Sequence, residues 1–333
     1  MRHPVLVTGG AGFIGSHTCK LLAQNGFEPI AYDNLSTGHR DSVRWGPLVV
    51  GDILDSTFLQ NTMKVFNPIA VMHFAAVASV AESVLNPALY YRVNVLGTLS
   101  LLDACRDAGI ENIIFSSSCA TYGIPSELPI RETTEQQPIN PYGGSKLIGE
   151  MMLQQAERTA GFRHVALRYF NAAGADLEGE LGERHDPETH AIPRILMAAS
   201  GLSCCFELFG DDYPTPDGTC VRDYVHVCDL ANAHLLALRY LLDGGDSLAL
   251  NLGTGAGLSI REIIQAVGRV TGRPVPTVSK PRRPGDPPAL YADGTLARDK
   301  LGFETRHSDI DTIVQTAAPH FELNRFSSLK AIA

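Results

Sequence analysis

The chain carries a tyrosine and a lysine four residues apart, within the segment Asn140-Pro141-Tyr142-Gly143-Gly144-Ser145-Lys146. Proline suits the first position of a helix and apolar residues follow, so we expect Tyr142 and Lys146 to share one side of one helix. A cation beside a phenol favours its ionised form, which moves the phenol pKa from about 10 toward working pH. The phenol could then accept a proton from a sugar or alcohol hydroxyl.

A glycine-rich turn near the N-terminus predicts a phosphate-binding site. The apolar segment 4–8 reads as a strand, and an amphipathic stretch that ends near Gly26 reads as a helix. Glycines between a strand and a helix permit a tight turn, close approach of a pyrophosphate and packing of the helix on the strand. Their spacing, GxxGxxG, departs from the commoner GxGxxG. The expected contacts are Gly9, Gly12, Phe13, Ile14 and Gly15.

Acidic residues end the next two predicted strands. Asp33 and Asn34 follow the strand 29–32, and Asp33 comes eighteen residues after Gly15, where a carboxylate can bind an adenosine ribose. Because a carboxylate there would repel a 2′-phosphate, we expect NAD rather than NADP. A third strand, 45–51, ends at Asp52 and Ile53, where the Asp52 carboxylate could meet the adenine amino group.

Further candidates lie at or near the ends of later strands, where ligands bind in an open parallel sheet. The strand 70–76 contains His73, which we interpret as a hydrogen-bonded core residue. The strand 112–115 leads into a serine-rich segment, and the strand 165–170 is the sixth. The helix 87–108 contains Asn94, whose buried side-chain amide could hydrogen-bond a neighbouring loop or the cofactor. The expected cofactor contacts from these elements are Phe74, Ala75, Ala76, Asn94, Ser116 and Tyr169.

The alternation of strands and helices predicts an α/β fold with a doubly wound parallel (Rossmann) sheet. At 333 residues the chain is long enough for two domains or for one domain with an appended part. We predict an NAD-binding domain over residues 1–170, rejoined by residues 220–245. Residues 171–333 should form a smaller, mixed α/β C-terminal domain that binds the substrate.

Composition excludes several classes of partner. A net charge of −9 argues against nucleic acid and anionic membranes, which bind clustered lysines and arginines. The most apolar run, 69–81, is interrupted by polar residues and is too short to span a bilayer, and no cleavable signal is visible. Seven scattered cysteines without a CxxC pair indicate reduced thiols in a cytoplasmic protein and no metal cluster.

Taken in order, these motifs resemble the extended short-chain dehydrogenase/reductase family and, within it, the UDP-galactose 4-epimerases. The resemblance runs from Val5 to about Phe303. Its most specific parts are the segments 168–171, 213–219, 221–224 and 282–286, which read Arg-Tyr-Phe-Asn, Tyr-Pro-Thr-Pro-Asp-Gly-Thr, Val-Arg-Asp-Tyr and Arg-Arg-Pro-Gly-Asp.

The resemblance implies tightly bound NAD and a UDP-sugar substrate. Tyr142 would take the proton of the sugar 4-hydroxyl while the C4 hydride passes to the nicotinamide. Lys146 would hold the nicotinamide ribose and, together with the positive nicotinamide, lower the phenol pKa. Ser118 would hydrogen-bond the same sugar oxygen. The 4-keto sugar would then turn over and take the hydride back on its other face.

The resemblance also implies a nucleotide site and a homodimer. Arg222 and Arg283 would bind the diphosphate, Asp286 the nucleotide's ribose, and Asn171 the diphosphate or the sugar. There are two departures from the pattern. Ala78 stands where close relatives often have a lysine that touches the cofactor, and Leu290, which is intermediate in bulk, stands where the family sets the room for an N-acetyl group.

Three alternatives remain. A sugar dehydratase or decarboxylase is one, although dehydratases carry an Asp-Glu pair where this chain has Cys119 and Ala120. A 4-epimerase for UDP-xylose and UDP-arabinose, or for UDP-N-acetylated hexoses, is the second. The third is a non-catalytic NAD-binding sensor, a class that usually lacks the catalytic tyrosine or lysine.

Overall fold

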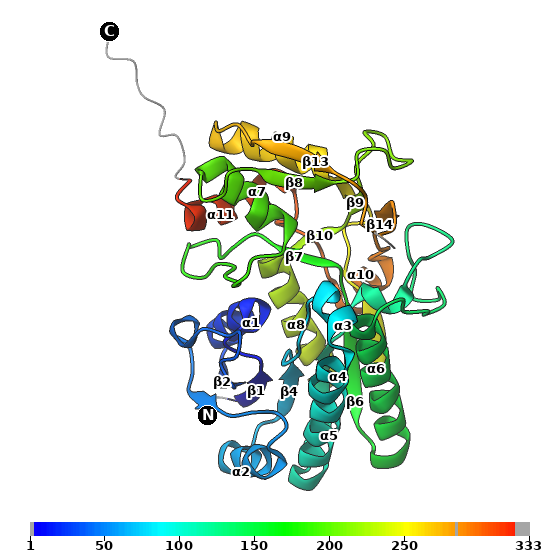
Figure 1. Ribbon diagram of the computed structural model, residues 1–333. Coiled ribbons are helices and arrows are strands. Elements are labelled where there is room, and N and C mark those ends of the chain that lie inside the picture. Colours follow the sequence, from blue (N-terminus) through cyan, green and yellow to red (C-terminus); the bar gives the residue numbers. More distant parts are fainter. Residues whose placement is uncertain (1–2, 284–285, 324–333) are drawn as a thin grey trace.

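The computed structural model describes residues 3–283 and 286–323 (Figure 1). A seven-stranded sheet forms the larger part, in the order β11-β6-β5-β4-β1-β2-β3, and every neighbouring pair is parallel. This order confirms the predicted doubly wound fold, and the chain reverses its direction of travel between β1 and β4. The strands are β1 His3–Thr8, β2 Phe27–Asp33, β3 Leu48–Val50, β4 Ala70–His73, β5 Asn112–Ser116, β6 Arg163–Arg168 and β11 Leu248–Asn251.

Helices cover both faces of the sheet. On one face lie α1 Phe13–Gln24 and α8 Val227–Leu242, with α10 Thr295–Leu301 beside α8. On the other lie α2 Ser56–Phe66, α5 Gly97–Ala108 and α6 Pro141–Ala160. Successive strand side chains point to opposite faces, so Val5 and Val7 belong to the first core and Leu6 to the second. Because both faces are buried, the strands are apolar throughout.

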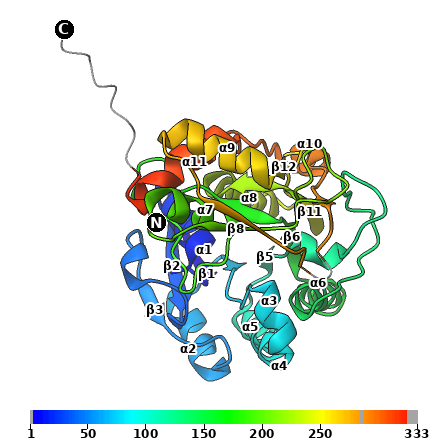
Figure 2. The same cartoon turned by 45° about the horizontal axis from the view of Figure 1, so that its top comes forward.

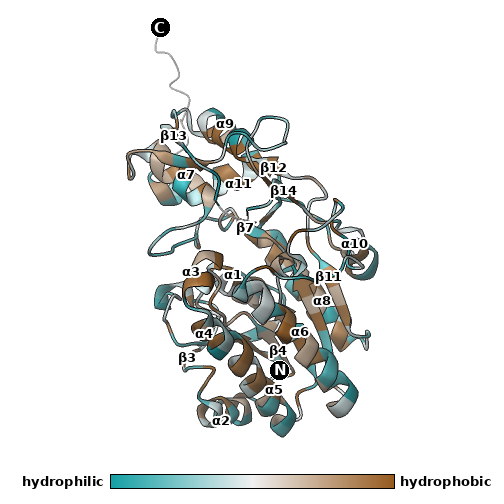
Figure 3. Cartoon of the chain, turned by 45° about the vertical axis from the view of Figure 1, so that its right-hand side comes forward, coloured by the Kyte–Doolittle hydropathy of each residue, from teal (hydrophilic) through white to brown (hydrophobic). Residues whose placement is uncertain are grey.

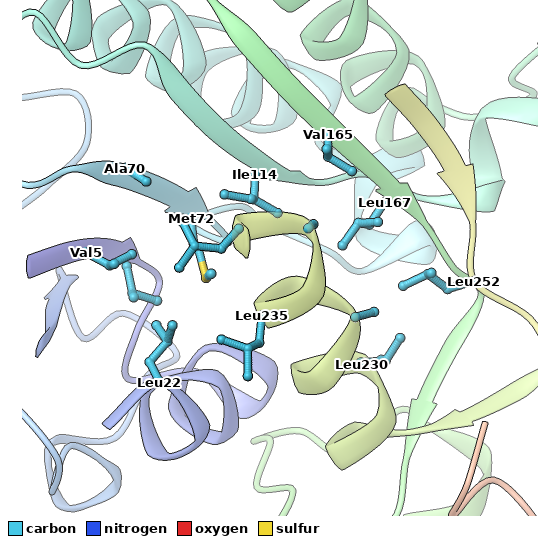
Figure 4. Close-up of a cluster of buried hydrophobic side chains, with 14 of the residues drawn as sticks. Val5, Leu22, Ala70, Met72, Ile114, Val165, Leu167, Leu230, Leu235 and Leu252 are labelled. Atoms are coloured by element: carbon cyan, nitrogen blue, oxygen red, sulfur yellow. The ribbon is translucent and has the colours of Figure 1, made fainter. Parts of the chain in front are cut away.

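The first core lies between α1, α8 and the central strands (Figure 4). Leu22 from α1 and Leu235 from α8 point toward Val5 and Met72, and Leu230 lies near Leu252. All six side chains are fully buried. Since α8 and β11 both follow residue 170 and yet belong to this layer, the chain returns to the first sheet after leaving it. The division into domains stays our interpretation.

The second part of the molecule is smaller and mixed, as predicted (Figure 2). Its three helices enclose a separate apolar core with short strands. The helices are α7 Ala191–Ser200, α9 Ile260–Thr271 and α11 Ile310–Ala317. The strand pairings are β7 Asn171–Ala173 with β10 Tyr224–His226, β8 Phe206–Phe209 with β13 Thr277–Lys280, and β9 Val221–Arg222 between β12 Leu258–Ser259 and β14 Ala289–Leu290.

Helix α6, which carries Tyr142 and Lys146, begins as its sequence predicts. Asn140 caps it by accepting a 2.8 Å hydrogen bond from the amide of Gly143, and Pro141 occupies the first turn. The helix ends at Gly161, whose φ of 71° is left-handed. Lys146 therefore lies one turn after Tyr142.

Several predicted elements have different bounds; the strand expected over 70–76, for example, ends at His73. The third strand is three residues long instead of seven, because it is an edge strand that pairs with β2 alone. The segment 87–108 is helical throughout, as predicted, but it is divided: α4 Pro87–Tyr90 passes into a π-helical turn, η2 Tyr91–Leu96, before α5 begins. A further short helix, α3 Val80–Leu85, precedes them. The 3₁₀ turns are η1 Arg40–Ser42, η3 Cys119–Tyr122 and η4 Ala318–Phe321.

Within the described ranges, no helix combines the length and the apolar composition needed to cross a membrane.

Candidate active site

A cleft of about 1190 Å³ opens along the carboxyl ends of the strands, with walls from both parts of the molecule. Its lining contains every predicted site residue except Asn94. Those residues are Gly9, Gly12, Phe13, Ile14, Gly15, Asp33, Asn34, Asp52, Ile53, Phe74, Ala75, Ala76, Ser116, Ser118, Tyr142, Lys146, Tyr169, Asn171, Arg222, Arg283, Asp286 and Leu290. The tertiary structure therefore gathers distant motifs at one surface.

The glycine turn forms one end of the cleft. Gly9 has a φ of +72°, and a Cβ there would lie 2.7 Å from the amide nitrogen of Ala75. A Cβ on Gly15 would lie 2.2 Å from the carbonyl oxygen of Gly9. Helix α1 starts at Phe13 with no side-chain cap, and the amides of its first turn have no acceptor within the helix. This end of the cleft can therefore bind the negative charge of a pyrophosphate.

Backbone amides hold the Asp33 carboxylate beside this turn. The amide of Ala11 donates to one carboxylate oxygen at 3.0 Å, and the amide of Leu35 donates to the other at 2.8 Å. Next to it, the Asn34 side chain donates a 2.9 Å hydrogen bond to Asp52. A fixed acceptor at the end of β2 suits the two hydroxyls of a ribose and disfavours a phosphate.

Tyr142 and Ser118 come together where α6 passes the end of β5. Burial raises the pKa of the Tyr142 phenol, and a hydrogen bond from Ser118 lowers it, with a net increase. The Tyr142 ring also packs edge-on against Tyr90, at 6.4 Å between centroids and an angle of 85°. The phenol therefore keeps its proton at neutral pH until a positive charge is brought to it.

Lys146 lies in the same region, one helical turn after Tyr142 on α6. Its ammonium donates a 2.7 Å hydrogen bond to the carbonyl oxygen of Ser116 and lies 5.2 Å from the centre of the Phe115 ring. Burial lowers the pKa of Lys146 to about 8, against the opposing effect of the Glu150 carboxylate. The predicted action of Lys146 on the Tyr142 phenol stays a prediction for the protein with its cofactor.

Tyr169 contributes to the same part of the cleft. Its hydroxyl lies 2.5 Å from that of Ser116. Behind it, the ring of His234 packs against Tyr169 at 6.2 Å and against Phe74 at 4.5 Å. Aromatic rings thus fix the positions of two predicted cofactor contacts, Phe74 and Tyr169.

Asn94 hydrogen-bonds a neighbouring loop. Its side-chain oxygen accepts from the amide of Val77 at 2.9 Å, and its NH₂ donates to the carbonyl of Val77 at 3.0 Å and to the hydroxyl of Ser145 at 2.9 Å. The residue is 3% exposed. The amide thus binds a neighbouring loop, as expected, and this loop lines the cleft through Val77 and Ala78. A contact between Asn94 and the cofactor stays a prediction.

The opposite end of the cleft holds the residues expected to bind the nucleotide. The Arg222 guanidinium is hydrogen-bonded and ion-paired with Asp286, and it also donates to the carbonyl of Val221 at 2.7 Å. Pairing of β9 with β14 brings Leu290 opposite Arg222. The guanidinium of Arg283 lies 4.1 Å from the centre of the Phe209 ring. A guanidinium stacked on a ring keeps its donors free for anions.

Two neighbouring residues have hydrogen-bond partners within the chain. Asn171 donates to the carbonyl of Asp223 at 2.8 Å, which ties β7 to the segment after β9. Arg282 turns toward Asp212 and the Tyr213 ring and does not line the cleft. Pro284 and Gly285, from the same predicted motif, lie outside the described residues.

A buried polar network that the sequence analysis missed supports the catalytic helix. Glu150 of α6 accepts hydrogen bonds from Ser117 and from the Arg168 guanidinium, the latter at 2.9 and 2.5 Å. Arg168 also donates to the Tyr122 hydroxyl at 2.7 Å, and Tyr122 donates to Asn251 at 2.7 Å. The network joins α6 to β6, to β11 and to the segment that follows β5. Glu150 lies two turns after Tyr142, and that helical spacing was the available signal.

A second missed group lies in the wall of the cleft. Glu183, His185 and His190 line it, and Glu188 lies beside them. Reasoning from cysteines could not detect this group, because it contains none. Its signal was the spacing Glu-x-His-x-x-Glu-x-His.

Residues 5–253 match the sequence model of a family described as the NAD dependent epimerase/dehydratase family. The chain belongs to this family. It is 52% identical over 313 residues to the UDP-glucose 4-epimerase of Rhizobium leguminosarum bv. trifolii, an alignment that covers 94% of this chain and 95% of the relative.

Solved structures of similar epimerases have the same fold. The UDP-glucose 4-epimerase of Brucella ovis, crystallised with NAD, superposes with a TM-score of 0.96 at 63% identity, over 97% of this chain and 99% of that one. The enzyme of Bifidobacterium longum, in complex with NAD⁺ and UDP, gives 0.89 at 38% identity, over 95% and 97%.

The site of this epimerase/dehydratase family member fits NAD, the cofactor on which the family depends. The Gly9 and Gly15 positions have no room for a side chain, the first turn of α1 offers free amides, and the Asp33 carboxylate faces the same cleft. Pyrophosphate and ribose therefore each have a matching partner.

Proposed function

We propose that the protein is a UDP-glucose 4-epimerase, an isomerase that interconverts UDP-glucose and UDP-galactose through oxidation at C4, rotation and reduction. The observation that carries the proposal is that Tyr142, Ser118 and Lys146 line one cleft, which has a dinucleotide end and an arginine-rich end. Side chains that can move a proton thus lie between two phosphate-binding ends. This arrangement matches a reaction between two bound nucleotides.

The chemistry that NAD supplies when bound is reversible acceptance of a hydride. Tyr142 accepts the proton of the sugar 4-hydroxyl through its phenol oxygen and later returns it. Ser118 hydrogen-bonds the phenol and the sugar oxygen, so that the proton moves along a defined line. Lys146, charged at neutral pH, stabilises the phenolate. Because the proton and hydride both return to the sugar, no co-substrate is consumed.

Inversion requires a firm hold on the nucleotide and a loose hold on the sugar. Arg222 and Arg283 bind the diphosphate, for which planar guanidinium groups are suited. Asp286, which pairs with Arg222, binds the nucleotide's ribose, and Asn171 lies near the sugar. The 4-keto sugar can then turn about its link to the diphosphate and present its other face to Tyr142.

Two features support epimerisation over dehydration. Elimination of water needs an additional acid and base after the catalytic serine, and that position holds Cys119, a buried thiol whose pKa burial raises well above its usual value. Its neighbour Ala120 has no polar group. Leu290, on the substrate wall, leaves room for sugars of different size, so UDP-xylose and the UDP-N-acetylated hexoses are the alternative substrates.

We further propose that the enzyme is a cytoplasmic homodimer. Apolar side chains are exposed on the outer surface of α3, η2, α5 and α6, where Figure 3 shows hydrophobic colouring. These side chains are Leu85, Tyr91, Leu96, Leu99 and Met151. A second copy would remove them from water. Sedimentation at the mass of one chain would contradict the dimer, and the seven free cysteines agree with a reducing compartment.

The test offers UDP-galactose, UDP-N-acetylgalactosamine and UDP-xylose side by side to the purified protein and measures each epimer formed. We expect UDP-galactose to be converted fastest, with reduced-nicotinamide absorbance appearing on the protein. Protein that binds NAD but turns over none of the three would be a sensor instead. Protein free of nicotinamide after gentle purification would contradict the mechanism.

A further inference from the structure

Four side chains from one short segment converge on the wall of the cleft. Glu183, His185, Glu188 and His190 place one potential ligand atom each within 4.8 Å of all the others. The Nδ1 atom of His190 lies 2.8 Å from Glu183 and 3.2 Å from Glu188, and the Nδ1 atom of His185 lies 3.3 and 3.5 Å from the same two carboxylates. Each imidazole thus lies within 3.5 Å of both carboxylates.

These separations are those of a tetrahedral metal site. Zinc binds histidine nitrogen and carboxylate oxygen at about 2.0–2.2 Å, so neighbouring ligand atoms of a tetrahedron lie roughly 3.3 Å apart. The distances of 3.3 and 2.8 Å from Glu183 Oε1 to the two imidazoles, and of 3.5 and 3.2 Å from the two oxygens of Glu188, fall around that value. Imidazole and carboxylate together suit zinc better than calcium or magnesium, which prefer oxygen ligands alone.

Burial strengthens the argument. The side chains of Glu183 and Glu188 are 5% and 7% exposed, and buried carboxylates need a cation. The Nδ1 atom of His185 is buried without a well-formed hydrogen bond, and it faces both carboxylates. A divalent ion between the two imidazoles and the two carboxylates would balance the buried charge.

A neighbouring acidic group, the carboxylates of Asp176, Glu178 and Glu180, differs in this respect. The Lys20 ammonium already lies 2.8, 2.7 and 2.6 Å from these three side chains. Its charge has a partner within the chain, so this group carries no metal proposal. The histidine-containing group has no lysine or arginine among its ion-pair partners in the described residues.

We propose that Glu183, His185, Glu188 and His190 bind one zinc ion. Four protein ligands make a closed site, which indicates a structural role. His190 is the residue immediately before α7, so the ion would fasten the connection between β7 and α7 to the start of that helix. Because three of the ligands line the cleft, the site would also fix the shape of its wall. The proposal is independent of the sugar that the enzyme accepts.

The experiment uses the full chain with its bound NAD. The protein is treated with a chelator, desalted, incubated with zinc chloride, desalted again and analysed for zinc by mass spectrometry. We expect one zinc per chain, and loss of zinc affinity by at least about tenfold in His185→Asn and Glu188→Gln. Cobalt(II) in place of zinc should give the visible absorption of a tetrahedral complex, which the same variants should lose.

Matched controls locate the ion. His3→Asn removes an exposed histidine that is distant in sequence from the four proposed ligands. Glu178→Gln removes a carboxylate of the neighbouring acidic group. Both controls should keep the zinc. Bound NAD and the melting temperature verify that each variant is folded. Wild-type protein that retains no zinc, or ligand variants that retain as much as wild type, would overturn the proposal, and zinc content is read independently of epimerase activity.

Discussion

The ammonium of Lys146 donates a 2.7 Å hydrogen bond to the carbonyl oxygen of Ser116, thirty residues earlier in the chain. This bond fastens the catalytic helix to the end of β5, beside the cleft. The ammonium is buried, and burial lowers its pKa to about 8. The residue that is proposed to support the Tyr142 phenolate therefore loses its charge within the range of pH in which the enzyme can be assayed.

The first prediction concerns this charge. Lys146 is protonated below its pKa, so its support of the phenolate is present at pH 7 and declines as the pH rises through about 8. Lys146→Met should lower kcat by about 10²–10³ and remove this alkaline decline. The measurement is kcat against pH for both proteins. A variant that keeps the wild-type alkaline limb would assign the titration to another group.

Tyr142→Phe should abolish the proton transfer and leave the cofactor in place. Loss of a general acid–base group typically costs about 10²–10⁴ in rate, and we expect kcat to fall by that factor with unchanged NAD content. Tyr240→Phe is the matched control, because Tyr240 lies on α8, outside the cleft lining. Equal turnover in Tyr142→Phe and Tyr240→Phe would refute the role of Tyr142.

Asp33→Asn tests the choice of dinucleotide. The substitution removes the negative charge that opposes a 2′-phosphate, and it weakens charge-assisted hydrogen bonds worth about 1.5–3 kcal/mol each. We expect NAD to be lost more easily on dialysis and NADP to bind better than to wild type. Asp103→Asn, at an exposed position of α5, should change neither property. Unaltered preference in Asp33→Asn would mean that the ribose lies elsewhere.

Glu150→Gln should destabilise the fold. The Glu150 and Arg168 side chains are 2% and 5% exposed, so the substitution leaves a buried guanidinium without its counter-charge. Such losses cost about 3–5 kcal/mol, measured as the free energy of unfolding in urea. Asp311→Asn breaks the exposed pair with Arg269 and should have no measurable effect. A stable Glu150→Gln protein would show that the network contributes little to stability.

Acid should destabilise the protein through buried histidines. Burial lowers the pKa of His73 and His226 to about 3, and that of His17 and His234 to about 4. The unfolded chain takes up these protons near pH 6.5, so stability falls as the pH drops below 6.5, by on the order of 2 kcal/mol per imidazole at pH 5.

Urea unfolding at pH 7 and pH 5 measures this effect. The variant His234→Gln lacks one titrating ring and should lose less stability than wild type over the same interval. Equal losses in the two proteins would exclude His234 as a source of the acid sensitivity.

The sequence determined the parts of the protein that depend on near neighbours in the chain. The glycine turn, the Asn140 cap and the Tyr142–Lys146 spacing are local, because turns, caps and helical faces depend on residues within about one turn of one another. Apolar strands alternating with helices were enough to predict a doubly wound sheet. The histidine–glutamate group was equally local, and its spacing alone could have indicated it.

Only the tertiary structure decided which distant side chains meet. Arg222 pairs with Asp286, and Glu150 binds Arg168, because strand order and helix packing bring these segments together. No local sequence pattern specifies that β11 pairs in the first sheet, or which loop Asn94 hydrogen-bonds. Both depend on the burial of two continuous faces of one sheet, a property of the whole chain.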